Sequence, residues 1–174
     1  MSRRKSLMGK SLLFFVFAGV IGLTASVATA HCEIPCGIYG DRMRVKMLRE
    51  HFKTVEKSMN KIQELQAEDD INYNQLVRWV NNKEDHANKI QEIVYQYFMN
   101  QRIKPVEEGA EGHDEYLSQV ELLHKMLVQA MKSKQTTDVE HVENLRSLLT
   151  DFEAMYFEEP GKSMESRHHG KHEH

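Results

Sequence analysis

The sequence predicts an all-α protein built as an antiparallel four-helix bundle. Apolar residues recur at steps of three and four in four separate segments, which is the spacing of one face of a helix. The 174 residues include only three prolines and nine glycines, so few residues interrupt helices. Four amphipathic helices joined by short connections bury their apolar faces most simply by packing around one core.

The first two segments have clear ends. We expect Asp41 to cap the first helix, and Glu68-Asp69-Asp70 interrupts its apolar pattern. The second helix should stop at Lys104-Pro105, because the residue before proline avoids helical angles. The first apolar face comprises Val45, Leu48, Phe52, Val55, Met59, Ile62 and Leu65. The second comprises Leu76, Val80, Ala87, Ile90, Val94 and Tyr97, widened by Trp79, Ile93 and Phe98.

The last two helices follow a polar linker that runs from Val106 to His113. Thr137 and Glu140 have the spacing of a capping box at the start of the fourth helix, and Pro160 closes it. The third apolar face comprises Tyr116, Val120, Leu123, Leu127 and Ala130, and the fourth Val142, Leu145, Leu149, Phe152 and Tyr156. The bundle is therefore expected over residues 40–160, followed by a polar, His-rich tail at 161–174.

Residues 1–30 have the features of a cleaved signal peptide. Their four charged residues are all Lys or Arg, an uncharged run extends from Ser11 to Ala30, and Ala28-Thr29-Ala30 is a small-x-small cleavage pattern. We expect an exported protein, periplasmic or extracellular, with no stable membrane contact after cleavage. The alternative is an uncut anchor, since 20 uncharged residues can span a bilayer.

The charge balance argues against a nucleic-acid partner. The whole chain has a formal net charge of −3, and loss of the leader with its four positive charges changes this to −7. A chain this anionic is a poor ligand for a phosphate backbone.

Cleavage after Ala30 would make His31 the first residue of the mature chain. A free α-amine, an imidazole, a backbone amide and the thiols of Cys32 and Cys36 then lie within six residues. Thiolates are soft ligands, and amine, imidazole and amide nitrogens suit the later first-row divalent ions. The amine, the Cys32 amide and the two sulfurs can form one plane, which favours nickel or copper over zinc, with the imidazole axial. We therefore expect a metal-binding hook at residues 31–39, preceding the bundle.

Two other interpretations of the cysteines remain open. In an exported protein, Cys32 and Cys36 are also candidates for a disulfide that closes a tight loop around Pro35. The same hook would also serve an exported nickel- or copper-binding bundle that senses or carries metal without turnover. Counting thiols under native and reducing conditions tests the first interpretation, and assaying the metal-loaded protein for catalytic turnover tests the second.

The nine residues of the hook resemble a known family. The pattern His-Cys-x-x-Pro-Cys-Gly-x-Tyr is similar to the nickel hook of nickel superoxide dismutases, which are small four-helix-bundle proteins that assemble as hexamers. Every position of the motif is occupied, by His31, Cys32, Pro35, Cys36, Gly37 and Tyr39.

The resemblance implies disproportionation of superoxide to dioxygen and hydrogen peroxide by Ni(II)/Ni(III) cycling, with one nickel ion per subunit of a homohexamer. It implies that His31 supplies the amine and the axial imidazole. It also implies that Cys32 supplies its amide nitrogen and thiolate, and Cys36 the second thiolate. Tyr39 would stand over the open face of the metal, so His31, Cys32, Cys36 and Tyr39 are the implied catalytic residues.

Two supporting positions depart from the family pattern. Lys46 or Met47 stands near the place of a glutamate that supports the axial imidazole in some members, and His86 is the candidate in place of a supporting arginine. The other histidines of the bundle have no ligand-like spacing, namely His51, His113, His124 and His141. The tail from Arg167 to His174 is either a polar terminus or a segment that gathers nickel near the hook.

Overall fold

The computed structural model describes residues 39–157 of the chain. The helices are α2 (Asp41–Gln66), α3 (Tyr73–Glu92), η1 (Ile93–Arg102), α4 (His113–Gln135) and α5 (Glu140–Phe157). The predicted signal peptide, the hook up to residue 38, Pro160 and the His-rich tail lie outside the described residues and stay predictions.

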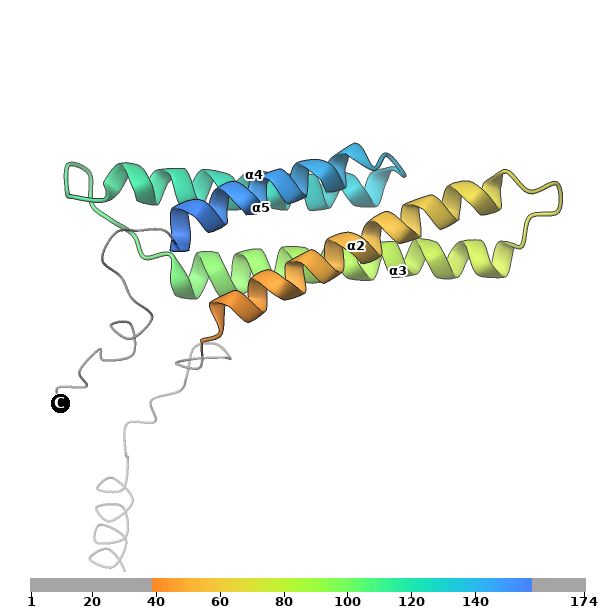
Figure 1. The fold of residues 1–174 in the computed structure, drawn as a ribbon, viewed down its shortest axis with the longest axis horizontal. Helices are drawn as coiled ribbons and strands as arrows, with labels where there is room; N and C mark the ends of the chain where they lie inside the picture. The colour runs from red at the N-terminus through yellow and green to blue at the C-terminus, as the bar shows by residue number, and fades with distance from the viewer. Residues whose placement is uncertain (1–38, 158–174) are drawn as a thin grey trace, which may run out of the picture. The chain divides into compact units, whose positions relative to one another are not determined.

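Two antiparallel hairpins form the bundle (Figure 1). One pairs α2 with α3 and the other pairs α4 with α5. The π-helix η1 continues α3 directly, so the two count as one helix of the bundle. The hairpins join through contacts of α3 with α4 and of α2 with α5, so each of the four helices has two neighbours. Among the described residues there is no strand, and the prediction of an all-α four-helix bundle is confirmed. No helix of residues 39–157 combines the length and the apolar character needed to cross a bilayer.

The predicted apolar faces form the core where all four helices meet. Every predicted position of α5 is buried, and so is every predicted position of α2 except Leu65, which is half-buried. In α4, Leu123 and Ala130 are buried, whereas Tyr116, Val120 and Leu127 are half-buried. Three phenylalanines, Phe52, Phe98 and Phe152, are fully enclosed. Burial of each such side chain stabilises the folded state by about 1.5–3 kcal/mol.

The first turns of α3 depart from the predicted pattern. Val80 is 37% exposed rather than buried, and Leu76 and Trp79 are half-buried. Tyr73 and Val77 are still more exposed. Figure 1 shows why, because the α2–α3 hairpin extends beyond the α4–α5 hairpin at the end where α2 and α3 are connected. No other described helix is available there to cover the apolar face.

Both predicted caps are wrong. The N-cap residue of α2 is Gly40, and the side chain of Asp41 makes no cap hydrogen bond. At the start of α5, the Asp138 carboxylate accepts the Glu140 N–H at 3.0 Å. Thr137 instead accepts hydrogen bonds from the Gln63 side chain at its carbonyl (2.9 Å) and hydroxyl (3.4 Å) oxygens. At the start of α5 a neighbouring residue, Asp138, therefore takes the role predicted for Thr137.

A buried lysine closes the C-terminal end of α4. The Lys83 ammonium, on α3, donates hydrogen bonds to the carbonyls of Ser133 (2.9 Å), Lys134 (2.5 Å) and Thr136 (3.0 Å). The last carbonyls of a helix lack partners within the helix, and a cation there also faces the negative end of the helix dipole. Lys83 is only 4% exposed, and burial lowers its pKa from the ordinary value. This residue therefore ties the two hairpins together.

Candidate metal centre

Tyr39 is the one predicted site residue that the structure describes. The predicted metal ligands His31, Cys32 and Cys36 lie outside the described residues. The structure does describe how the chain continues from the hook into α2, starting with Gly40 and Asp41.

A cluster of polar side chains surrounds the Asp41 carboxylate. Tyr97 Oη donates to Oδ1 at 2.6 Å, and Tyr156 Oη donates to Oδ2 at 2.9 Å. The Arg102 guanidinium binds both oxygens, from Nε to Oδ1 and from Nη2 to Oδ2, each at 2.8 Å. Such paired charge-assisted hydrogen bonds are among the strongest polar contacts in proteins. We call these four residues the Asp41 cluster.

The Asp41 cluster also holds the residue that follows Tyr39. The Gly40 N–H donates a hydrogen bond of 2.8 Å to Tyr97 Oη, and the same hydroxyl donates onward to Asp41. The phenol of Tyr97 thus links the backbone N–H of Gly40, the N-cap residue of α2, to Asp41, the first residue of that helix. The Arg44 guanidinium covers the face of the Tyr97 ring, 4.9 Å from its centroid.

Burial and hydrogen bonding set the protonation states of the cluster. Burial would raise the pKa of the Asp41 carboxyl, but hydrogen bonds from Arg102, Tyr97 and Tyr156 together hold that pKa below its usual value. Burial and the bond to Asp41 raise the pKa of the Tyr97 phenol well above the ordinary value. Burial would lower the pKa of Arg102, but the bond to Asp41 raises it. At neutral pH the cluster therefore contains a carboxylate, a guanidinium and a neutral Tyr97 phenol.

A π-helix brings two members of the cluster together. Tyr97 and Arg102 both lie in η1, five residues apart. In an α-helix, five residues turn by about 140° beyond one full turn and would point to different faces. The wider turn of a π-helix aligns residues at i and i+5, and such segments are frequent at functional sites. The apolar spacing of the sequence predicts one continuous α-helix here, and it gives no signal of a π-helix.

Aromatic packing supports the cluster from the core side. The Phe98 ring contacts Tyr97 (5.1 Å between centroids), Phe152 (5.1 Å) and Tyr156 (5.8 Å) edge to face. Phe152 and Tyr156 stack at 5.1 Å with an interplanar angle of 17°. Edge-to-face and offset-stacked pairs add about 0.5–1.5 kcal/mol each beyond area burial. The predicted core residues Tyr97 and Tyr156 thus have a second role, which their apolar spacing did not indicate.

The structure pairs His86 with a histidine that sequence spacing did not connect to it. His86 Nδ1, on α3, lies 3.0 Å from His51 Nδ1, on α2, and the ring centroids are 5.0 Å apart. Because residues 31–38 are outside the described part, support of the His31 imidazole by His86 stays a prediction. Met47 is half-buried on α2 and Lys46 is exposed.

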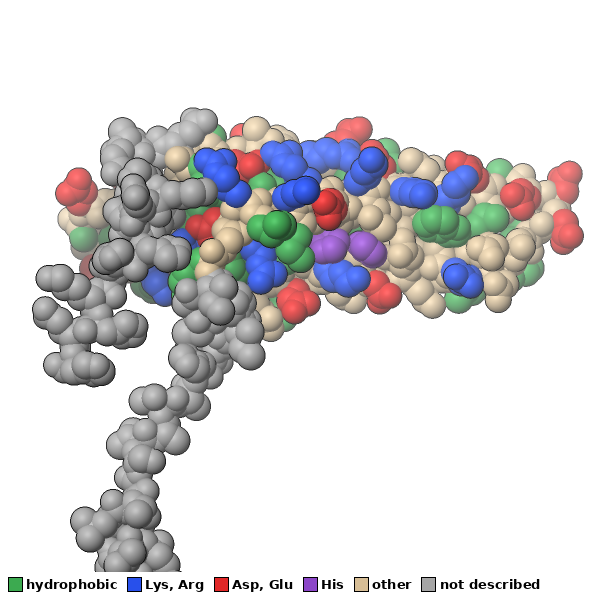
Figure 2. Space-filling model, turned by 60° about the horizontal axis from the view of Figure 1, so that its bottom comes forward, with side chains coloured by type: hydrophobic (Ala, Val, Ile, Leu, Met, Phe, Trp, Pro, Cys, Tyr) green, Lys and Arg blue, Asp and Glu red, His purple; other side chains and the backbone are tan. Residues whose placement is uncertain are grey.

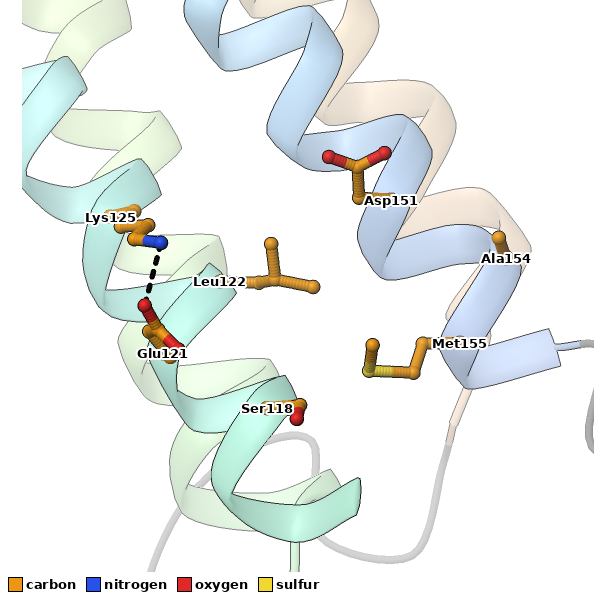
Figure 3. A pocket seen from close by; sticks show the side chains of 7 residues that line it. All are labelled: Ser118, Glu121, Leu122, Lys125, Asp151, Ala154 and Met155. Carbon is orange, nitrogen blue, oxygen red and sulfur yellow. Dashed lines mark ion pairs between the residues drawn. The ribbon is translucent and has the colours of Figure 1, made fainter. Parts of the chain in front are cut away.

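An open groove lies between α4 and α5 (Figure 3). Its lining residues are far in the sequence from the start of α2. It has a volume of about 520 Å³ and is lined by Ser118, Glu121, Leu122, Lys125, Asp151, Ala154 and Met155. Glu121 and Lys125 form an ion pair of 2.6 Å across one turn of α4. The lining contains no histidine or cysteine, so this groove offers neither an imidazole nor a thiolate to a nickel ion.

The predicted nickel ligands are those of the hook, and they stay a prediction. Within residues 39–157, no group of three or more His, Cys, Asp or Glu side chains is arranged to hold a metal ion. The donor set of His31, Cys32 and Cys36, with two sulfurs and several nitrogens, fits an ion of the nickel and copper class by its chemistry. The junction fits this assignment, because Gly40 is held directly after the hook.

Comparison with known proteins identifies the family of the chain. Residues 26–160 match the family described as nickel-containing superoxide dismutase, and this range covers the hook and all of the described helices. Searches of curated proteins and of solved structures find no match to the chain. The match extends over most of the sequence, and we conclude that the chain belongs to the nickel-containing superoxide dismutase family.

Proposed function

We propose that this protein is an exported, nickel-dependent superoxide dismutase that binds one nickel ion per subunit. The observation that carries the proposal is the family match over residues 26–160. This range includes residues 31–39, where the sequence has every donor residue of the hook motif. The overall reaction takes two superoxide anions and two protons to dioxygen and hydrogen peroxide.

Each ligand has a distinct role in the proposed site. His31 supplies its α-amine and imidazole, Cys32 its amide nitrogen and thiolate, and Cys36 a second thiolate. Bound nickel would supply the redox couple, Ni(II)/Ni(III), that accepts an electron from one superoxide and donates an electron to the next. The two anionic thiolates and the anionic amide favour the higher oxidation state by placing negative charge on the ligands. Tyr39 would limit access to small anions.

The Asp41 cluster contributes to this site by holding Gly40, the residue that directly follows the hook. Gly40 is bound by Tyr97, whose hydroxyl also donates to Asp41. Tyr97 is in turn fixed by the packing of Phe98 and by the guanidinium of Arg44. A rigid anchor directly after Tyr39 restricts the positions open to that side chain, and sites held this way need less reorganisation during turnover.

Processing is part of the proposed function. Before cleavage, the nitrogen of His31 is a peptide amide and a much poorer donor than a free amine. The precursor would therefore lack one of the nitrogen donors of the proposed site, and full activity would require a chain that begins at His31. Activity of an intact precursor equal to that of the mature chain would contradict this part of the proposal.

The test combines intact mass, metal analysis and superoxide decay on one preparation of exported protein. We expect a chain that begins at His31, holds about one nickel per subunit and accelerates superoxide decay, with sedimentation reporting the hexamer that the resemblance implies. The matched control is Cys36→Ser, which removes one thiolate and leaves the bundle intact. Nickel binding without accelerated decay would identify a metal carrier, and a Cys32–Cys36 disulfide without metal would identify a structural bundle.

A further inference from the structure

We propose that His51 and His86 form a second, labile metal site, which binds a divalent ion of the nickel-to-zinc group between α2 and α3. The site is separate from the hook in its residues and does not depend on the proposed dismutase activity. It rests on two imidazole nitrogens that converge from different helices.

The geometry suits one ion shared by both rings. Nitrogens bound to one ion at about 2.0–2.1 Å lie about 2.8–3.4 Å apart, for angles between a right angle and the tetrahedral angle. His51 Nδ1 and His86 Nδ1 are 3.0 Å apart, and their rings meet at 71°. Both side chains are half-buried, so the pair is held by the bundle yet reached from solvent. Figure 2 shows histidine side chains together at the surface, beside Lys and Arg side chains.

The protonation state at neutral pH leaves both rings able to bind metal. Burial, the charge of His86 and the charge of Lys89 lower the pKa of His51, while Glu50 opposes this shift. Burial and Lys89 lower the pKa of His86, while Asp85 opposes it. Both rings are therefore mainly neutral at pH 7, and without metal one Nδ1–H donates to the other Nδ1.

Metal binding then needs only a change of tautomer. The ring that carries its proton on Nδ1 loses that proton to solvent and gains one on Nε2, so no net proton is released. Imidazole is a preferred ligand of nickel, copper and zinc, and the positions that the two rings leave open would be filled by water. Glu50 and Asp85 place one carboxylate within electrostatic range of each ring. With only two protein ligands, the ion exchanges with solvent.

The experiment uses Zn²⁺ as the probe and a readout assigned to the two rings. The chain from His31 to His174 is first loaded with nickel, then titrated with Zn²⁺ while the imidazole ¹⁵N resonances are followed by NMR. His51→Gln and His86→Gln assign the signals, and bound zinc is counted for each variant. His124→Gln is the matched control, because His124 is an exposed histidine on α4.

We expect both Nδ1 resonances to shift together with zinc, and each single variant of the pair to bind one zinc fewer than the control. We also expect zinc to raise the unfolding temperature of the control more than that of either variant, because the ion joins α2 to α3. Metal bound at the hook or tail does not affect this comparison, since both segments are present in every variant. Unshifted Nδ1 resonances under saturating zinc, or equal zinc counts in all variants, would show a hydrogen-bonded pair without a metal site and would overturn the proposal.

Discussion

Replacing Asp41 with asparagine should destabilise the bundle far more than the same change at an exposed ion pair. In Asp41→Asn the charge that receives four hydrogen bonds is lost, while the shape and one oxygen acceptor remain. Breaking a buried ion pair costs about 3–5 kcal/mol, whereas exposed pairs contribute about 0.2–1 kcal/mol. The Asp41 and Arg102 side chains are only 15% and 12% exposed, so most of this ion pair is shielded from water. We expect a loss of about 2–3 kcal/mol, since the remaining oxygen keeps part of the network.

The matched control is Glu56→Gln. The Arg146 guanidinium binds both oxygens of Glu56, at 3.0 and 2.7 Å, but the Arg146 and Glu56 side chains are 39% and 31% exposed. The control should therefore lose less than about 1 kcal/mol. Urea unfolding followed by circular dichroism measures the free energy of unfolding of both variants. In thermal unfolding, the expected fall in Tm for Asp41→Asn is about 8–12 °C for a domain of this size.

Acid provides a second test of the same reasoning. The folded-state pKa of Asp41 is lowered, so this carboxyl contributes stability that is present above its unfolded pKa of about 3.9 and is lost as pH falls through the folded value. The difference between wild type and Asp41→Asn should therefore shrink below about pH 4. Equal losses for Asp41→Asn and Glu56→Gln at neutral pH, or a gap that does not change in acid, would refute the argument.

Three further predictions concern the hook, Lys83 and the histidine pair. Cys36→Ser should abolish nickel retention and superoxide turnover with an unchanged unfolding midpoint, as metal analysis and urea titration would report. Lys83→Met should cost about 2–4 kcal/mol in urea unfolding, because it leaves three carbonyls at the end of α4 without their buried donor; a loss below about 0.5 kcal/mol would contradict this. The pKa values of His51 and His86 are lowered in the folded state, so below about pH 6.5 the unfolded chain binds more protons than the folded chain. Wild type should therefore lose more stability between pH 7 and 5 than the variant with both histidines changed to Gln. Equal losses would count against this prediction.

The helices and most of the core were predictable because they depend on local periodicity. Val142, Leu145 and Leu149 are spaced so that any packed α5 must bury them together, and they are buried. The same reasoning was wrong at Val80, which has equally good spacing but lies where α2 and α3 extend beyond the other hairpin. Periodicity identifies the apolar side of a helix, but it does not say whether another helix covers that side.

The junction between hook and bundle was not predictable in the same way. Asp41 stands where a capping residue is expected, and its carboxylate instead binds Arg102, which is 61 residues away. That contact requires the π-helical turn of η1, which no local pattern indicated. His51 and His86 likewise looked unrelated until α2 and α3 packed side by side.

The sequence by itself determined the four helices and most of their apolar faces, and it predicts the donor set of the hook, because each depends on residues close together in the chain. His31, Cys32 and Cys36 show their chemistry through identity and spacing alone. Only the tertiary structure decided which polar side chains became partners, as in the Asp41 cluster and the pair of His51 and His86. Those contacts join residues from different helices, and their energy depends on burial and distance, which exist only once the bundle has packed.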